Sequence, residues 1–236
     1  MWLSKVRVDG RTAQDAYRLH AALLGLLPDV KRKTKPEDDR PYLYAIEDLR
    51  TGIGGNLMML SFIEPQNSGL GATILGKKSV NDMGVVDGGR MAFHLIANPV
   101  KSVRDHQTAR KGKPDTKLSK KGRMRSVKVR VPLLTLDGRL AWLEHKLQGA
   151  ARVIRQQPEP QVWTLKPLHF RKHEKPSISS PEAGTTKTRI HHGKIAQVRF
   201  EGHLVVEDAK RLLALIRGGI GHGRAFGCGL LLVRRV

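Results

Sequence analysis

Apolar and polar residues alternate with a period of two along several short stretches of the chain, and this pattern predicts β-strands. The stretches cover residues 2–8, 42–48, 57–63, 90–97, 162–170, 187–200, 204–206 and 230–235. Three longer stretches, residues 13–27, 137–153 and 207–217, space their apolar residues three and four apart, which predicts amphipathic helices. We expect Thr12 to cap the first helix and Pro28 to end it.

The order of these elements predicts an α+β fold of two tandem ferredoxin-like domains. Residues 1–88 open with a β-α-β-β pattern, which matches one ferredoxin-like half. Its second helix is weak, because residues 65–88 are rich in Gly, Asn and Asp and contain only short apolar runs. Residues 89–236 contain a second β-α-β-β-α-β pattern, so we place the domain boundary near Gly89.

The last helix and the last strand are joined by a segment in which six of the twelve residues 218–229 are glycine. Dinucleotide-binding and P-loop motifs lie between a strand and a following helix, so the reversed order here excludes both. A helix C-cap explains one or two glycines but not six. We therefore predict a shaped loop around Arg224, whose conformation depends on Gly219, Gly221, Gly223, Gly227 and Gly229.

The charge balance points to a nucleic-acid partner. The 236 residues include 43 Lys and Arg against 21 Asp and Glu, a formal net charge of +22. Only 5% of the residues are aromatic, which leaves few rings on which the bases of a single strand could stack. Phosphate contacts and shape recognition of a duplex or hairpin are therefore favoured. The basic residues do not follow an apolar helix, so membrane-surface binding is disfavoured.

The sequence offers little for a metal, disulfide or membrane site. Cys228 is the single cysteine, which excludes a disulfide framework, and we expect it to pack rather than react. Ten histidines are present, but no pair has a cluster of carboxylates beside it, so we expect no metal and no cofactor. There is no run of about 20 apolar residues and no signal-peptide pattern, so we expect a cytoplasmic protein without a membrane partner.

Tyr17 and His20 are the candidates for chemistry. They lie three residues apart on the first predicted helix, at the edge of its apolar face, so they are surface neighbours. The pair fits a half-buried structural contact, or a site of proton transfer by an imidazole of near-neutral pKa. RNA cleavage without a metal needs such a group, because the 2′-OH beside the scissile phosphate serves as the nucleophile once it loses its proton.

The segment Gly221-x-Gly223-Arg224-Ala225-Phe226-Gly227-Cys228-Gly229 resembles the glycine-rich loop of the RAMP superfamily, and most closely that of the CasE family. CasE proteins are the CRISPR repeat-RNA endoribonucleases of the type I-E Cascade complex. Residues 1–6, 17–20 and 95–101 agree with the same family, so the resemblance covers essentially the whole chain in order. It implies two RRM-like ferredoxin domains and docking on the backbone subunit of Cascade. It also implies metal-independent cleavage of the CRISPR repeat stem-loop, which leaves a 2′,3′-cyclic phosphate and a 5′-OH, and retention of the product.

The resemblance also implies roles for individual residues. His20 falls at the position of the catalytic histidine and Tyr17 at that of its neighbouring tyrosine. Some family members carry a lysine shortly after the histidine, whereas residues 21–27 contain none. Charge stabilisation would then come from Arg18 or from a basic residue across the groove, and both alternatives stay open.

For RNA binding, the family inserts a basic β-hairpin into the major groove of the stem-loop. Arg171, Lys172 and Lys175 resemble the basic cluster of that hairpin. Further candidates are Arg18, Arg224 and four residues expected on the following hairpin, Lys187, Arg189, Lys194 and Arg199. The same charges also fit a merely solvated surface, and we expect about half of them to touch phosphate. Residues 101–130 hold twelve Lys and Arg and only two Asp, and they fit either a solvated loop or an arm that contacts RNA or a subunit.

Two alternatives to an endoribonuclease remain at this point. One is an RAMP subunit that binds an RNA hairpin without cutting it, and the other is a basic RNA-associated structural protein. Cleavage of a hairpin without magnesium would distinguish an endoribonuclease from both alternatives. Hairpin-specific binding would distinguish the non-cutting subunit from the structural protein.

Overall fold

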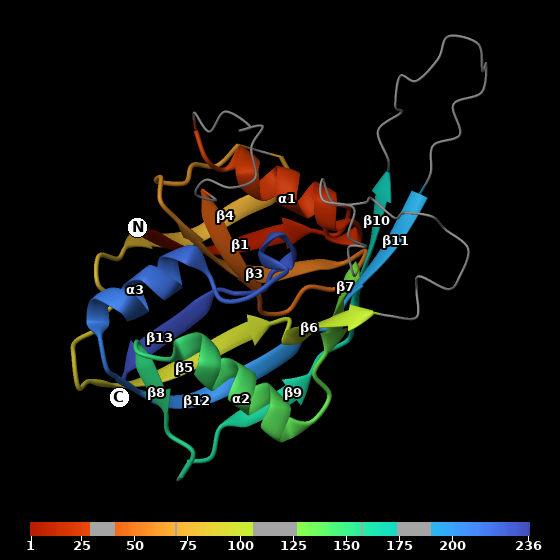
Figure 1. Ribbon diagram of the computed structural model, residues 1–236. Helices are drawn as coiled ribbons and strands as arrows, with labels where there is room; N and C mark the ends of the chain where they lie inside the picture. Colours follow the sequence, from red (N-terminus) through yellow and green to blue (C-terminus); the bar gives the residue numbers. More distant parts are fainter. Residues whose placement is uncertain (29–40, 69, 106–126, 157, 174–189) are drawn as a thin grey trace, which may run out of the picture.

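The computed structural model describes residues 1–28, 41–68, 70–105, 127–156, 158–173 and 190–236. The first unit is a four-stranded antiparallel sheet with the order β2-β3-β1-β4. Its elements are β1 (Trp2–Asp9), α1 (Ala16–Gly25), β2 (Tyr42–Ile46), β3 (Gly54–Ser61) and β4 (Ala72–Ser79). Helix α1 lies across one face of this sheet (Figure 1).

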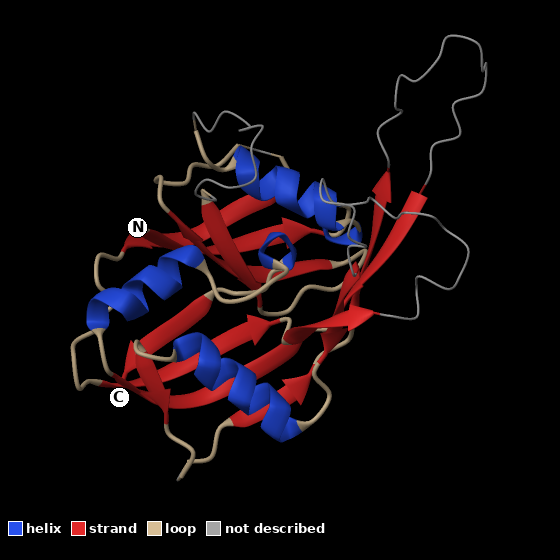
Figure 2. Cartoon of the chain, viewed as in Figure 1, coloured by secondary structure: helices blue, strands red, loops and turns tan. Residues whose placement is uncertain are grey.

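The second unit repeats this arrangement with the order β13-β5-β12-β8. Its elements are β5 (Arg90–Ala97), α2 (Leu136–Leu147), β8 (Ala151–Val153), β9 (Gln161–Thr164), β12 (Val198–Val206), α3 (Ala209–Gly218) and β13 (Leu231–Arg235), with β9 paired to β12 beside β8. Helices α2 and α3 cover one face of the sheet (Figure 2). In both units the first strand lies between the third and the fourth, so the predicted tandem ferredoxin-like fold is confirmed.

Two insertions extend the second unit. Strands β6 (Val100–Asp105) and β7 (Val127–Pro132) form one two-stranded sheet, and β10 (Leu168–His173) and β11 (Ile190–Ile195) form another. The β10–β11 pair projects from the molecule as a long ribbon (Figure 1). Of the basic stretch 101–130, the two ends are therefore strands, and residues 106–126 lie outside the described part of the chain.

Several predicted boundaries are wrong, each for a local reason. The first helix begins one turn later than expected, because Thr12 belongs to a short 3-10 turn, η1 (Thr12–Gln14), and Asp15 is the N-cap of α1. The predicted helix 137–153 ends at Leu147, since the chain turns at Gly149 with φ of +73° and then enters β8.

Several observed strands also begin or end at residues other than those predicted. The predicted strand 162–170 is two strands, β9 and β10, which pair with different partners. Strand β12 runs unbroken through Glu201 and Gly202, where an interruption was expected. Strand β4 was missed altogether, because Gly76, Lys77, Lys78 and Ser79 give its second half a polar sequence. No helix lies between β3 and β4 among the described residues, in agreement with the weak pattern there.

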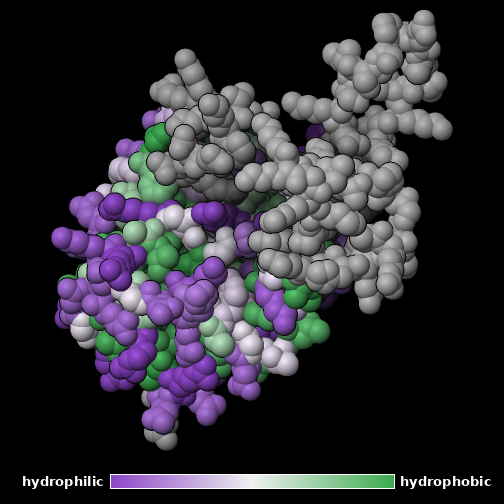
Figure 3. Space-filling model, viewed as in Figure 1, coloured by the Kyte–Doolittle hydropathy of each residue, from purple (hydrophilic) through white to green (hydrophobic). Residues whose placement is uncertain are grey.

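Each unit has its own apolar core. In the first, Leu19 and Leu23 of α1 pack with Val6, Val8 and Leu57 of the sheet. The larger core of the second unit also takes in Leu43 and Leu60, from the outer face of the first sheet. Apolar contacts therefore join the two units, while hydrophilic side chains cover much of the surface over α2 and α3 (Figure 3). No helix in the described part of the chain is long and apolar enough to cross a membrane.

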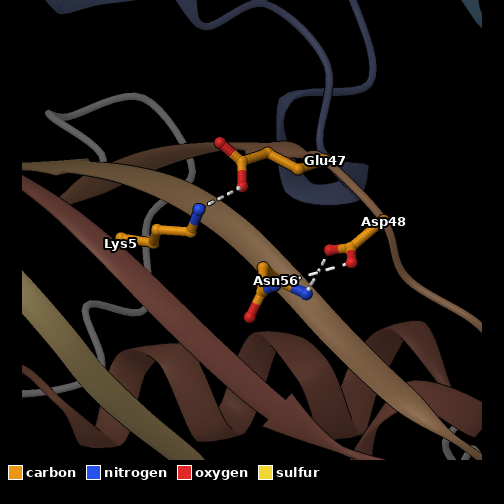
Figure 4. Close-up of polar contacts among 4 residues, drawn as sticks. All are labelled: Lys5, Glu47, Asp48 and Asn56. Atoms are coloured by element: carbon orange, nitrogen blue, oxygen red, sulfur yellow. Dashed lines mark hydrogen bonds and ion pairs between the residues drawn. The ribbon is translucent and has the colours of Figure 1, made fainter.

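Polar contacts fix the strands that present the site. The carboxylate of Asp48 accepts from the backbone N–H of Asn56 at 2.7 Å, across the connection between β2 and β3 (Figure 4). Nζ of Lys5 lies 3.3 Å from Oε2 of Glu47, which links β1 to the end of β2. Both contacts hold β2 in register with its neighbours, and β2 carries the tyrosines described next.

Candidate active site and nucleic-acid interface

The first turn of α1 fixes the positions of Tyr17 and His20. Oδ1 of Asp15 accepts from the backbone N–H groups of Tyr17 at 2.6 Å and Arg18 at 3.2 Å, which satisfies two unpaired donors at the helix N-terminus. Leu19 is buried against the sheet, so Tyr17 and His20 lie at the edge of the apolar face. Tyr17 is 44% exposed, whereas His20 is half-buried, as the sequence pattern predicted.

Tyr42 of β2 holds the imidazole of His20. Its hydroxyl donates to the backbone carbonyl of His20 at 3.0 Å, and the same oxygen is in close hydrogen-bond contact with Nδ1 of the ring. The hydroxyl has one proton. When the carbonyl accepts that proton, the second bond is satisfied by Nδ1–H donating to the hydroxyl oxygen. Neutral His20 then carries its lone pair on Nε2, the nitrogen suited to accept a proton.

The glycine loop contacts α1 and β2 at two points. The rings of Tyr17 and Phe226 meet edge to face with centroids 6.4 Å apart. The hydroxyl of Tyr44, two residues after Tyr42 on the same face of β2, donates to the carbonyl of Ala225 at 3.0 Å. Burial raises the pKa of Tyr44, so this hydroxyl stays protonated and keeps donating.

The loop has the shape that its glycines predicted. All five of the named glycines have φ between +74° and +92°, a region that other residues rarely adopt. A Cβ on Gly229 would lie 2.8 Å from the carbonyl oxygen of Ile220, because the backbones of these two residues pair. Gly218, in contrast, has an ordinary φ and open space around it, so it belongs to α3 and not to the shaped part.

Arg224 lies in a short 3-10 turn, η3 (Arg224–Phe226), at the centre of the loop. Its Nη1 donates to the carbonyl oxygen of Gly218, at the C-terminus of α3. A cation at this end of a helix is favourable, because the unpaired carbonyls carry partial negative charge. Arg224 therefore has a structural contact, and its contact with RNA stays a prediction.

Gln197 connects the β10–β11 hairpin to the glycine loop. It lies between β11 and β12 with 7% of its surface exposed, and its Nε2 donates to the carbonyl of Phe226 at 3.0 Å. The same nitrogen lies 3.5 Å from Sγ of Cys228. Burial raises the pKa of this thiol to about 11, so Cys228 packs as an inert side chain, as expected.

The basic residues chosen from the sequence do not all lie together. Arg18 is exposed on α1, and Lys194 is exposed on β11 opposite His169 of β10. Arg171 and Lys172 lie on β10, where their backbones pair with those of His192 and His191. Lys175, Lys187 and Arg189 fall outside the described residues.

Arg199 was expected on the hairpin, and that placement is wrong. It lies in β12, paired with Ile96 of β5 and Trp163 of β9, where its Nε is buried without a hydrogen-bond partner. The error arose because the chain passes from β11 to β12 with only Ala196 and Gln197 between them.

The sequence reasoning missed Tyr42 and Gln197, and it did not identify the ring contact of Phe226. The alternation Tyr42-x-Tyr44 in a predicted strand places both tyrosines on one face, which was a usable signal. Gln197 gave none, because a buried amide cannot be told from an exposed one in a single sequence.

A second polar cluster lies away from this site, on the open face of the second sheet. There His94, Glu201 and His203 line a hollow of about 550 Å³. Burial is the main cause that lowers the pKa of His94. Among the residues that the structure describes, no group of three His, Cys, Asp or Glu side chains could hold a metal ion.

Comparison with known proteins gives one consistent result. A family model described as CRISPR associated protein matches residues 1–235. The chain is 32% identical over 231 residues to the Cascade subunit CasE of Escherichia coli K12, covering 98% of each chain. The crystal structure of Cas6e from E. coli K-12 matches with a TM-score of 0.71 and 30% identity over 100% of both chains. Thermus thermophilus Cse3, bound to an RNA that represents a pre-cleavage complex, matches with a TM-score of 0.64 and 26% identity over 98% of both chains.

Proposed function

The chain belongs to the CRISPR-associated protein family that includes the Cascade subunit CasE, and on that premise we propose that it cuts the stem-loop of CRISPR repeat RNA. It is an endoribonuclease that works as a Cascade subunit beside the backbone subunit, and it keeps its product bound. Its relative Cse3 is named an endoribonuclease and forms a complex with RNA before cleavage. The net charge of +22 suits an RNA partner.

The observation that carries the proposal is the contact between Tyr42 and His20. It holds the imidazole with Nε2 as the proton acceptor, at the edge of an exposed helix face and one turn from Tyr17. A general base in this state removes the proton of a 2′-OH without a metal ion.

The reaction follows from these groups. His20 takes the 2′-OH proton, the 2′-oxygen bonds to the adjacent phosphorus, and the bond from phosphorus to the 5′-oxygen breaks. The 5′-oxygen takes a proton from water and His20 returns its proton to the solvent, which leaves a 2′,3′-cyclic phosphate and a 5′-OH. Tyr17 orients the phosphate through its exposed hydroxyl, and Arg18, exposed beside it, offsets the negative charge of the transition state.

We assign binding to the β10–β11 ribbon, because the resemblance implies a basic hairpin that enters the major groove of the stem. Arg171, Lys172 and Lys194 are the described basic residues on these strands, and Lys175, Lys187 and Arg189 complete the proposed set. Gln197 ties the base of the ribbon to the glycine loop, and Phe226 of that loop contacts Tyr17. This chain of contacts gives the bound stem a fixed position relative to α1.

The chemistry is tested with a labelled repeat hairpin in excess EDTA. We expect cleavage at the 3′ base of the stem, a cyclic phosphate on one product and a 5′-OH on the other. A hairpin with a single 2′-deoxy nucleotide before the scissile phosphate should bind equally well and remain uncut, because it lacks the nucleophile. Cleavage of the deoxy substrate, or a strict need for magnesium, would overturn the proposed mechanism. Tight hairpin binding without any cleavage would favour a non-catalytic subunit.

A further inference from the structure

A second group of basic side chains lies on the glycine loop and on elements next to it. The backbone of His222 bridges to Asn98, just beyond the end of β5. Strand β6 begins two residues after Asn98 and pairs with β7, which carries Arg130. The third member is Lys146, on the last turn of α2. All three side chains are exposed.

Close packing holds these elements together. The ring of Trp142 on α2 stacks against Phe200 with centroids 6.2 Å apart. A Cβ on Gly221 would lie 2.8 Å from this ring, so only a glycine lets the loop approach α2 so closely. Lys146 lies one turn after Trp142 on the same side of the helix, and His222 directly follows Gly221.

The side chains of this group have no acidic partner in the described part of the chain. Within the described ranges, no ion pair or hydrogen bond involves the side chain of Arg130, Lys146 or His222. Some exposed cations elsewhere are paired: Arg155, for example, forms two hydrogen bonds of 2.7 Å with Glu144 of α2. The pKa of His222 is lowered first by desolvation of the buried part of its ring and then by the positive charges of Arg130, Lys146 and Arg224. The charges are consistent with a local positive field.

A simpler explanation accounts for only part of the group. A lysine on the last turn of a helix is stabilised by the partial negative charge of the helix C-terminus, which explains Lys146. Arg130 lies on a strand and His222 in a loop, so that effect does not place them here.

We propose that Arg130, Lys146 and His222, together called the basic strip, bind the phosphates of single-stranded RNA that flanks the repeat stem-loop. The strip and the candidate active site share the glycine loop: His222 lies four residues before Phe226, whose ring contacts Tyr17. We therefore route the RNA strand that leaves the stem at α1 along the strip. The ammonium group of a lysine and the guanidinium group of an arginine bind the phosphates of the RNA backbone. Such contacts do not depend on the base sequence. This inference rests on the proposed function and adds the path of the flanking strand.

The test compares two RNAs with two matched variants. The first RNA is the repeat hairpin with single-stranded flanks, and the second is the same hairpin without them. Arg130→Ala/Lys146→Ala removes two exposed charges of the strip. Arg152→Ala/Lys210→Ala removes two exposed charges elsewhere, on β8 and α3, and serves as the control.

We expect the strip variant to bind the flanked hairpin about tenfold more weakly, with a salt dependence of log Kd that is smaller by about 1.4 for two lost contacts to a single strand. Binding of the hairpin without flanks should stay unchanged, and the control variant should match the wild type on both RNAs. Equal weakening on both RNAs, or no weakening on either, would overturn the proposal. Wild-type affinity for both RNAs together with failed assembly into Cascade would assign the strip to a protein partner instead. Cleavage by the wild type in EDTA is measured in parallel, so that failure of the proposed function is seen separately.

Discussion

The hydroxyl of Tyr42 donates to the carbonyl of His20 at 3.0 Å and contacts Nδ1 of the same histidine; Tyr42 is the first residue of β2. One side chain thus holds both the backbone and the ring of the candidate base. Because Tyr42 is 5% exposed and packed in the core of the first unit, its position is set by the fold. The orientation of the imidazole is therefore built into the protein before RNA binds.

Tyr42→Phe tests this positioning role. The variant keeps the ring but loses the hydroxyl, so Nδ1 loses its acceptor and the imidazole no longer favours one tautomer. We expect the single-turnover cleavage rate to fall about five- to tenfold, the effect of one net hydrogen bond of roughly 1 kcal/mol, while hairpin Kd stays within about twofold. The pH profile of cleavage should shift as well, which a purely structural role would not produce. An unchanged cleavage rate and pH profile would show that Tyr42 does not position His20 for catalysis.

Tyr17 has two separable features, its ring and its hydroxyl. The ring contacts Phe226, whereas we propose that the hydroxyl contacts the phosphate. Tyr17→Phe should keep thermal stability within about 1 °C of the wild type and lower the cleavage rate about tenfold, since one hydrogen bond to a charged group is lost. Tyr17→Ala should lower both. If Tyr17→Phe cleaves at the wild-type rate, the tyrosine acts through packing alone.

Much of this arrangement could be predicted from the sequence, and the reasons for success and failure are physical. The five glycines with positive φ were identified because few other residues adopt that backbone conformation. Tyr17 and His20 were placed on one helix edge because helical spacing depends on sequence distance alone. Tyr42 and Gln197 were missed because their contacts join residues 22 and 29 positions apart, and spacing does not encode such tertiary pairs. Strand β4 was missed because its exposed second half is polar, and Arg199 was misplaced because two strands follow each other almost directly.

Gln197→Ala should loosen the connection between the hairpin and the loop. The substitution removes the hydrogen bond that the part-buried carbonyl of Phe226 accepts from Gln197, which lowers the free energy of unfolding by about 1 kcal/mol. Denaturant unfolding measures this loss directly. Gln161→Ala, at an exposed position on β9, is the matched control and should change stability by less than about 0.5 kcal/mol. Equal stability of the two variants would contradict the link.

RNA affinity should depend on pH through His222. Burial and the neighbouring cations hold its pKa below the usual 6.5, so in the free protein it is neutral near pH 7. A bound phosphate favours the charged form and raises this pKa, so binding takes up a proton and affinity for the flanked hairpin rises as pH falls below about 6.5. The stability of the free protein changes in the opposite direction. Because His222 has the higher pKa in the unfolded chain, the unfolded state takes up the proton first, and the free energy of unfolding falls as the pH falls over the same range. Titration of Kd between pH 5.5 and 7.5 should show a smaller rise for His222→Gln; the same rise in both proteins would exclude this residue.

His20 is proposed to perform the proton transfer, and single-turnover cleavage of the repeat hairpin in EDTA by His20→Ala tests this role most directly. Loss of a general base lowers the rate by about 10²–10⁴-fold, and we expect hairpin Kd to remain at the wild-type value. His203→Ala, a histidine on the open face of the second sheet, should cleave normally. Cleavage by His20→Ala at close to the wild-type rate would contradict the account and place the chemistry elsewhere.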